Sequence, residues 1–527
     1  MARRSAVPIP PMGLLVPLVG LILGLTSVYT LPAAAAVLAG AIGSIAFRRR
    51  WRDLFLLCAF AAFGWLRGSC AAEKKIPWKF VGAECEMAMR IERCTARNYG
   101  SWRRINGFAK LEKIGDGDGQ FGQSIYYNLR LDNGVAVPLR GQLLLARASI
   151  RPTAKGKVPF ERYLRESGIQ YRVGRGKATA VESGSAVDEF LAKLLSKCGS
   201  ALGRSMDADS KASHIYGAML LGKRDGLSAR EKNCYSRAGV AHLFAISGLH
   251  IGIIAAFLAA ATGWTSMAPP SLFALRAFLL LLFVAMTGSS PSSIRAFLMV
   301  SSIWAAPLFF RRSRSLQALA LAAILTLSAK PAALLNTGFQ FSYGVVFAIL
   351  TYGIPLSRQL RKALFPERQL FQKEESRSRL RSIGASCVDM VAISFSTTIP
   401  LIPLSLYHFQ IFSIGGILLN PLIIPVAEIA ILLGFCSICC GFFGIFIGCH
   451  LLNILAKPFL WVIVALCGAV GNVPWLQSGN FTLGTAQLLL WISVIFLTLS
   501  RALQDGGKSA WRLVAPVAAA ILPLPLL

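Results

Sequence analysis

The chain has 527 residues, of which 55% are hydrophobic and only 15% are charged, and its mean hydropathy is +0.58. This balance excludes an ordinary soluble protein of this length, so we predict a polytopic membrane protein that is mostly α-helical. A formal net charge of +31 is large for such a protein. It indicates cytoplasmic anchoring charges, an anionic partner, or both.

The N-terminal region, residues 1–66, contains three apolar segments, at 12–29, 31–47 and 53–66. A transmembrane helix needs about 20 apolar residues, so the third segment is the shortest candidate. The basic start and the alanines at 33–36 also resemble a secretory signal, but the apolar character resumes at once, which favours retained helices. Arginines between 48 and 52 follow the second segment, and the positive-inside rule places them and the N-terminus in the cytoplasm.

Further apolar segments follow a long polar region, near 240–264, 272–288, 293–310, 315–331, 338–356, 384–406, 411–434, 442–467, 484–500 and 513–527. With these spans, the basic clusters at 311–314, 358–381 and 501–512 all fall on the cytoplasmic side. We therefore predict a helical bundle of about 11–13 transmembrane helices. The polar region from 67 to 183 is then an inserted extracytoplasmic domain.

Residues 67–183 break into short stretches with the alternation of β-strands. In the segment 84–92, Cys85, Met87 and Met89 alternate with charged residues, which is strand periodicity. Further candidate strands lie at 104–113, 124–131, 141–150 and 169–175. About five strands in about 100 residues favour a small β-barrel, and an OB-fold is the natural candidate.

Aromatic and basic side chains are interleaved along the first strands of this domain. OB-folds often bind single nucleic-acid strands by stacking bases on aromatic rings within a basic groove. We identify six candidate nucleic-acid-binding residues, which are Tyr99, Trp102, Arg103, Arg104, Lys110 and Tyr126. The alternative is that half of the aromatic residues form the barrel core and the basic residues form a solvated face.

The segment 184–238 is an amphipathic linker between the barrel and the bundle. Residues 186–206 place Val187, Phe190 and Leu194 on one helical face. Such a helix either lies on the membrane surface or packs under the barrel, and packing is the favoured interpretation.

The stretch from 217 to 255 is polar up to Gly239 and apolar beyond it. A helix that enters the bilayer here carries His242, Ser247 and His250. A charge at the bilayer centre costs about 2.5 to 3.5 kcal/mol, and ionisable side chains persist there mainly when they face a bundle interior or a wet path. We therefore predict that these residues line or support a pore.

Other polar residues stand within apolar segments, namely Arg295, Gln340, Asn420 and Glu428. The simplest interpretation is a buried network in which Arg295 pairs with Glu428. Helix interruptions are expected at four prolines, at positions 400, 403, 421 and 425. Broken helices are tolerated where they line a cavity, so pore lining and plain kinked packing stay equal alternatives.

Four ordered motifs carry a resemblance to a known family, and they lie at 217–255, 287–299, 331–350 and 394–429. They resemble the ComEC-type competence family, bacterial membrane channels through which single-stranded DNA enters the cell. The resemblance implies a channel domain over 239–470, C-terminal helices over 471–527 and an extracytoplasmic OB-like domain. It also implies an inner-membrane location, and it gives Arg295 a role in attracting phosphates as a strand crosses.

The same resemblance implies partners. Beyond the lipid bilayer and single-stranded DNA, we expect a periplasmic or surface DNA receptor and a cytoplasmic ATPase or DNA-binding protein, and a homo-oligomer is compatible with this role. Many members continue into a metallo-β-lactamase-like domain whose chemistry needs a histidine-rich metal motif. This chain has five histidines in all, so it resembles a form that lacks that domain.

No catalytic residue, metal ligand or cofactor is predicted. His242 and His250 lack a third ligand at a recognised spacing, and the segment 502–509 approaches a phosphate-binding loop without room for a nucleotide-binding sheet. Two other functions stay open. One is a small-solute transporter with an extracytoplasmic regulatory domain. The other is an intramembrane hydrolase with Ser247 as the nucleophile and His408 or His450 as the base.

Overall fold

The structure is a computed structural model. It describes residues 76–77, 80–115, 121–153, 160–161, 169–206, 210–224, 226–310, 314–365, 375–413, 415–473 and 477–479, with a few isolated positions besides. For residues 375–383 it describes the backbone alone. The predicted spans at 12–29, 31–47, 53–66, 484–500 and 513–527 lie outside the described residues, isolated positions aside.

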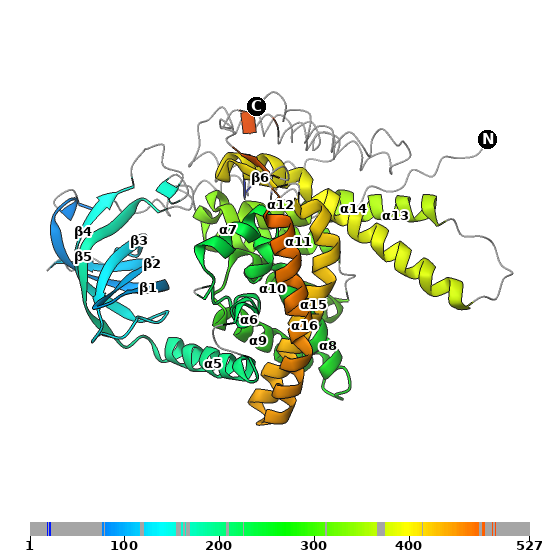
Figure 1. Ribbon diagram of the computed structural model, residues 1–527, viewed down its shortest axis with the longest axis horizontal. Coiled ribbons are helices and arrows are strands. Elements are labelled where there is room, and N and C mark those ends of the chain that lie inside the picture. The colour runs from blue at the N-terminus through cyan, green and yellow to red at the C-terminus, as the bar shows by residue number, and fades with distance from the viewer. Residues whose placement is uncertain are drawn as a thin grey trace.

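Five strands form a closed barrel at one end of the molecule (Figure 1), and they are β1 (Glu84–Tyr99), β2 (Trp102–Ile114), β3 (Gln123–Asp132), β4 (Leu143–Pro152) and β5 (Tyr171–Glu182). Their order around the barrel is β1-β2-β3-β5-β4. All pairs are antiparallel except β3 with β5, which is parallel. The predicted small OB-like barrel is thus confirmed, with longer strands than the sequence pattern indicated.

The barrel core follows from the alternation of its strands. Met87, Met89 and Ile91 of β1 point inward and are at most 3% exposed. Tyr127 of β3 also lies in the core, where its hydroxyl donates to the backbone oxygen of Arg93 (3.1 Å). Burial raises the pKa of the Tyr127 phenol, so it remains a neutral donor.

The helical part contains α8 (Gly248–Thr262), α9 (Pro269–Met286), α10 (Pro291–Ala305), α11 (Ser315–Ala329), α12 (Thr337–Ala348), α13 (Ile354–Leu364), α14 (Glu375–Phe409), α15 (Gly415–Phe442) and α16 (Phe446–Gly471). Short helical turns occur at η2 (Ala241–Phe244), η3 (Ala306–Phe309), η4 (Pro331–Leu335) and η5 (Ile349–Gly353). Two short strands, β6 (Ile411–Ser413) and β7 (Gln477–Gly479), pair antiparallel.

Six helical segments among the described residues are long and apolar enough to cross a membrane, and α8 and α11 are shorter apolar helices. Each predicted span between residues 240 and 467 contains a helix. The predicted multi-pass helical membrane protein is therefore confirmed. The predicted interruptions at the four prolines are wrong, because α14 continues through Pro400 and Pro403, and α15 continues through Pro421 and Pro425.

Three helices join the barrel to the bundle, and they are α5 (Ala186–Gly203), α6 (Lys211–Leu221) and α7 (Ala229–Arg237). Helix α5 buries Cys198, Ala201 and Leu202, and it packs against α15 and α6, so the predicted packing under the barrel is wrong and α5 packs on other helices instead. Val187 and Phe190 are 65% and 55% exposed, which makes the predicted apolar face wrong at its N-terminal end. The residues of α5 that are buried lie on the side of the helix that packs against α15.

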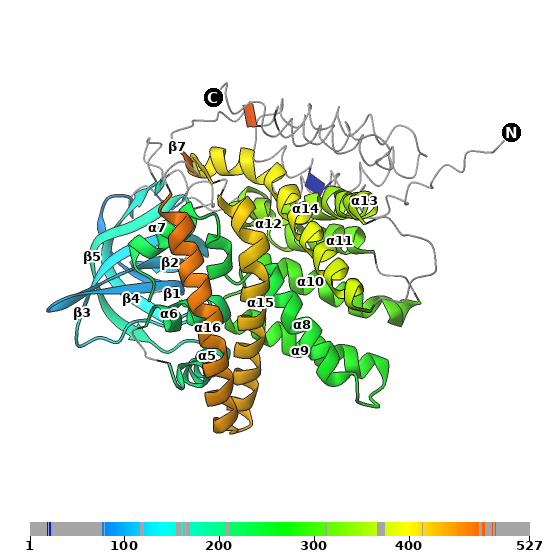
Figure 2. The same cartoon turned by 45° about the vertical axis from the view of Figure 1, so that its right-hand side comes forward.

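Helices α15 and α16 run side by side, as Figures 1 and 2 both show, and α5, α6 and α7 pack against this pair. Asn453 of α16 is fully buried and its amide donates to backbone oxygens at the end of α5, those of Ala201 (2.8 Å), Leu202 (3.3 Å) and Arg204 (2.9 Å). The last carbonyls of a helix lack partners within the helix. The side chain of Asn453 therefore caps the C-terminal end of α5 and fixes it to α16.

Candidate functional site

The turn between β1 and β2 carries an aromatic platform. Tyr99 and Trp102 face each other across the turn, with ring centroids 4.9 Å apart and an interplanar angle of 13°. The guanidinium of Arg104 lies 5.6 Å from the Tyr99 ring and 5.7 Å from the Trp102 ring. Tyr99 is 47% exposed, so a planar ligand has access to this stack.

A row of cations runs from this platform around the outside of the barrel. The strand register places Arg97 opposite Arg104 and Arg104 opposite Arg130. It then places Arg130 opposite Lys177, and Lys177 opposite Arg147. All five side chains are exposed. Like charges directly opposite each other on neighbouring strands destabilise a sheet, so the arrangement is favourable only where an anion neutralises it.

The acidic neighbours of this row are few. Asp132 lies 2.6 Å from Lys177 and 3.9 Å from Arg130. Among the described residues, no carboxylate forms an ion pair with Arg97, Arg104 or Arg147. The row therefore keeps a net positive charge beside the aromatic platform.

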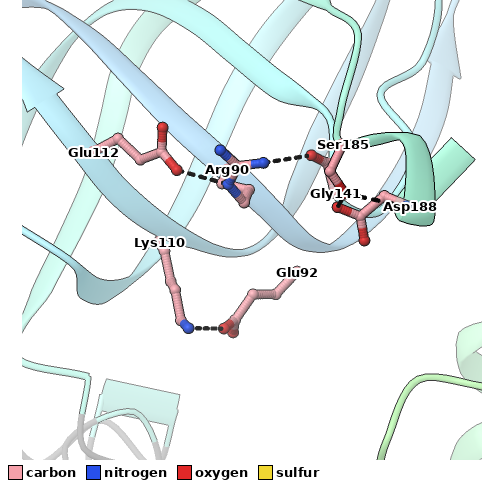
Figure 3. Close-up of polar contacts among 7 residues, drawn as sticks. All are labelled: Arg90, Glu92, Lys110, Glu112, Gly141, Ser185 and Asp188. Carbon is pink, nitrogen blue, oxygen red and sulfur yellow. Dashed lines mark hydrogen bonds and ion pairs between the residues drawn. The ribbon is translucent and has the colours of Figure 1, made fainter. Parts of the chain in front are cut away.

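The predicted residues occupy different parts of this surface. Tyr126 accepts a hydrogen bond from Asn106 (3.1 Å) and packs edge-on against Phe108, two rows along the same face from the Arg104 and Arg130 pair. Lys110 lies further along β2, 3.9 Å from Glu92 (Figure 3). Arg103 donates to backbone oxygens of the loop after β3, those of Asn133 (2.7 Å) and Val135 (3.2 Å), and so holds that loop.

Sequence reasoning missed four members of the row. Arg130 stands at an outward position of the predicted strand 124–131, so alternation alone was enough to identify it. Arg97 lies beyond the predicted strand 84–92, in the part of β1 that the sequence pattern did not include. Arg147 and Lys177 needed the register, because the parallel pairing of β3 with β5 joins positions that are far apart in the sequence.

A second polar cluster lies where α8 begins. Ser247 is the N-cap of α8, and the Nδ1 atom of His250 accepts from the Ser247 backbone N–H (3.0 Å) and lies 2.7 Å from its hydroxyl. His250 is 1% exposed, and its Nε2 has no partner among the described residues. The prediction of one helix over 240–264 is wrong, because this cap starts α8 at Gly248. His242 lies on η2, the turn before this cap, and is exposed.

Arg295 of α10 packs directly on the start of α8. An added Cβ at Gly248 would collide with Nη2 of Arg295, so a larger residue there requires the buried guanidinium to move. Arg295 is 5% exposed and donates through Nη1 to the backbone oxygen of Ser342. The predicted pair with Glu428 is wrong, because no ion pair joins these two described residues and Glu428 is only half-buried.

Serines of the turn before α10 complete this junction. The backbone N–H of Gly248 donates to Oγ of Ser292 (3.1 Å), and the hydroxyl of Ser290 donates to the backbone oxygen of Ile246 (3.2 Å). We call the contacts among Ser247, His250, Arg295, Gly248 and Ser292 the helix junction. The motif at 287–299 thus docks on the motif at 217–255.

The remaining predicted residues lie elsewhere in the bundle. Gln340 of α12 donates to the backbone oxygen of Leu334 (3.0 Å), and its Oε1 lies 2.8 Å from Nε2 of His408 on α14. The side-chain oxygen of Asn420 is buried without a partner among the described residues. The histidines named as bases for Ser247 contact other groups, since His408 meets Gln340 and His450 meets Ser205.

Comparison with known proteins identifies relatives of this chain, and the family match covers the helix junction. A family model described as Competence protein matches residues 219–504, which is more than half of the chain. ComE operon protein 3 of Bacillus subtilis (strain 168) is 28% identical over 351 residues, which cover 66% of this chain and 39% of that protein. The matched part is thus well under half of that relative's length. No solved structure gives a significant match.

Proposed function

Because the chain belongs to the competence protein family, we propose that it is a channel of the bacterial inner membrane that takes up single-stranded DNA during natural transformation. The barrel binds the incoming strand outside the bilayer, and the helices between about residues 215 and 470 form the conduit. The N-terminus lies in the cytoplasm. A DNA receptor outside and an ATPase or DNA-binding protein inside act with the channel, and a homo-oligomer is compatible with this role.

One observation carries the proposal, and it is the cationic row next to the Tyr99 and Trp102 stack. Bases that are unpaired expose their faces, and stacking one on an aromatic side chain contributes about 1–3 kcal/mol. Phosphates of the same strand bind Arg97, Arg104 and Arg130 and release their counterions. A duplex presents phosphates but hides its base faces, so the platform favours a single strand.

The helix junction has a supporting role in this proposal. Arg295 and His250 are almost fully buried, so they hold α8, α10 and α12 in register. Gln340 does the same for α12 and α14 through His408. Asn420, Glu428 and the exposed His242 are assigned to the path itself. Supporting residues fix the width of a conduit without contacting every nucleotide.

The proposal is tested by uptake of labelled DNA in a transformable strain from which the gene is deleted. Complementation with the wild-type gene restores nuclease-protected DNA inside the cell, and complementation with His250→Ala or with the Arg97→Gln, Arg104→Gln double variant restores less. Immunoblots of membrane fractions check that each variant accumulates. Normal internalisation in the deletion strain would refute the assignment. Ser247→Ala separates the hydrolase alternative, which requires loss of peptide cleavage with DNA uptake intact.

A further inference from the structure

The barrel contacts the bundle through the loop between β3 and β4. Nη1 of Arg140 donates to the backbone oxygen of Ala285 (2.9 Å), in the last turn of α9. The last carbonyls of a helix carry partial negative charge, and a cation there is stabilising. Among the described residues, no carboxylate forms an ion pair with Arg140. Its strongest described partner is therefore in the bundle.

The loop that carries Arg140 is fixed on the barrel side. The N–H of Gly141 donates to the oxygen of Ile91 (2.7 Å), and the N–H of Ile91 donates to the oxygen of Gln142 (2.9 Å). Nη1 of Arg90 donates to the backbone oxygen of Gly141 (3.4 Å), and Nε of Arg90 donates to Oε1 of Glu112 (2.6 Å), as Figure 3 shows. These hydrogen bonds fix the backbone next to Arg140 to strand β1.

Gly141 also locks this loop to the start of α5. Its φ of +85° lies in the left-handed region, and an added Cβ would collide with the side chain of Asp188. Asp188 is itself fixed by Ser185, whose hydroxyl donates to its carboxylate (2.8 Å). The loop therefore packs closely on the first turn of α5.

The bundle side of the contact leads straight to the helix junction. After Ala285 the chain turns through Gly288 and Ser289, with φ of +105° and +49°. Within the next residues, Ser290 and Ser292 make the two hydrogen bonds that hold the chain at Ile246 and Gly248. A displacement of the α9 end is thus passed to the start of α8 by a few short, directional contacts.

We propose that Arg140 is a positioning residue that sets the α9–α10 turn against the barrel, so that a strand bound on the barrel is delivered to the conduit that the helix junction supports. This inference rests on the proposed function. It places Arg140 outside the binding surface proper, so its loss impairs the transfer of DNA into the bundle and leaves the binding of DNA to the barrel intact.

The test uses the full-length protein with Arg140→Ala, Arg140→Lys and, as a matched control in the same loop, Leu139→Ala. Leu139 is 54% exposed, and its backbone N–H donates to Oε1 of Gln142 in the same loop (2.7 Å), a bond that the substitution retains. Binding of a fluorescent oligo-dT strand is measured on detergent-purified protein, and uptake of labelled DNA is measured in the complemented deletion strain. We expect Arg140→Ala to bind within about twofold of wild type and to take up about tenfold less DNA.

The variants separate the possible outcomes. Arg140→Lys keeps a cation at the α9 end and restores uptake in part, and Leu139→Ala is unchanged in both assays. Wild-type uptake by Arg140→Ala overturns the inference. So does a loss of oligo-dT binding that matches the loss of uptake, because Arg140 would then be part of the binding surface. If Arg140→Ala fails to accumulate in membranes, Arg140→Lys is the test. Uptake between that of wild type and the deletion strain supports the inference, and wild-type uptake overturns it. Failure of the proposed function is recognised separately, as wild-type protein that binds no DNA.

Discussion

Replacing Arg104 with glutamine removes a central cation of the barrel row and keeps a long polar side chain. For single strands, each neutralised phosphate contributes about 0.7 to the slope of log affinity against log salt. We therefore expect the slope of Arg104→Gln to be smaller than that of wild type by about 0.7. Between about 50 and 200 mM salt, the wild-type protein then loses about 2.6 times more affinity than the variant. The Arg97→Gln, Arg104→Gln pair loses about 1.4 from the slope.

The assay is fluorescence anisotropy of labelled oligo-dT titrated with purified protein at several salt concentrations. Lys362→Gln is the control, because this exposed lysine lies on α13, in the bundle and not in the barrel, and its removal lowers the net charge equally. We expect the control to keep the wild-type slope. Equal slopes for wild type, Arg104→Gln and the double variant would refute the reasoning, since the row would then neutralise no phosphates.

Three further predictions concern the platform and the helical core. Trp102→Ala loses about 1–3 kcal/mol of oligo-dT binding and Trp102→Phe loses less, as anisotropy will show. Gly248→Ala destabilises the protein by about 1–3 kcal/mol, because the new methyl group collides with Arg295. Gly252→Ala, one turn later with open space around it, does not lower the thermal unfolding midpoint, because alanine favours the helix, so equal midpoints for both variants would contradict the model of the junction. Asn453→Ala lowers that midpoint and exposes the α5 end to proteolysis, because three carbonyls lose their donor.

The sequence predicted most of the fold because each kind of element has its own period. Alternation at Met87 and Met89 predicted β1, and long apolar runs predicted the spans now seen as helices. Capping was harder to predict, since the helix at 248 starts where the His250 ring meets the Ser247 backbone, and a hydropathy profile carries no trace of that contact. The prolines were wrongly predicted to interrupt their helices, because α14 and α15 each contain two prolines within a continuous helix.

The candidate site was predicted only as far as its local signals reached. The interleaving of aromatic and basic residues identified Trp102 and Arg104, which lie together. The predicted partner of Arg295 was wrong because the sequence suggested a carboxylate, whereas the fold supplies a backbone oxygen at Ser342 and a glycine surface. Tertiary packing determines which backbone oxygens a side chain meets and which side chains contact a glycine. Residue types in the sequence therefore do not predict these contacts.

The two cationic groups differ in what surrounds them, and this difference bears on how a conduit releases its cargo. The barrel row is exposed, and at physiological salt its field decays over about 8 Å, so each contact with a phosphate is weak. Arg295 is 5% exposed, and a buried charge that bound a phosphate directly would hold it strongly. Transport needs contacts favourable enough to admit a polyanion and weak enough to let it leave. In the channel that we propose, transient binding therefore falls to the barrel, and Arg295 contributes by fixing the helices that bound the path.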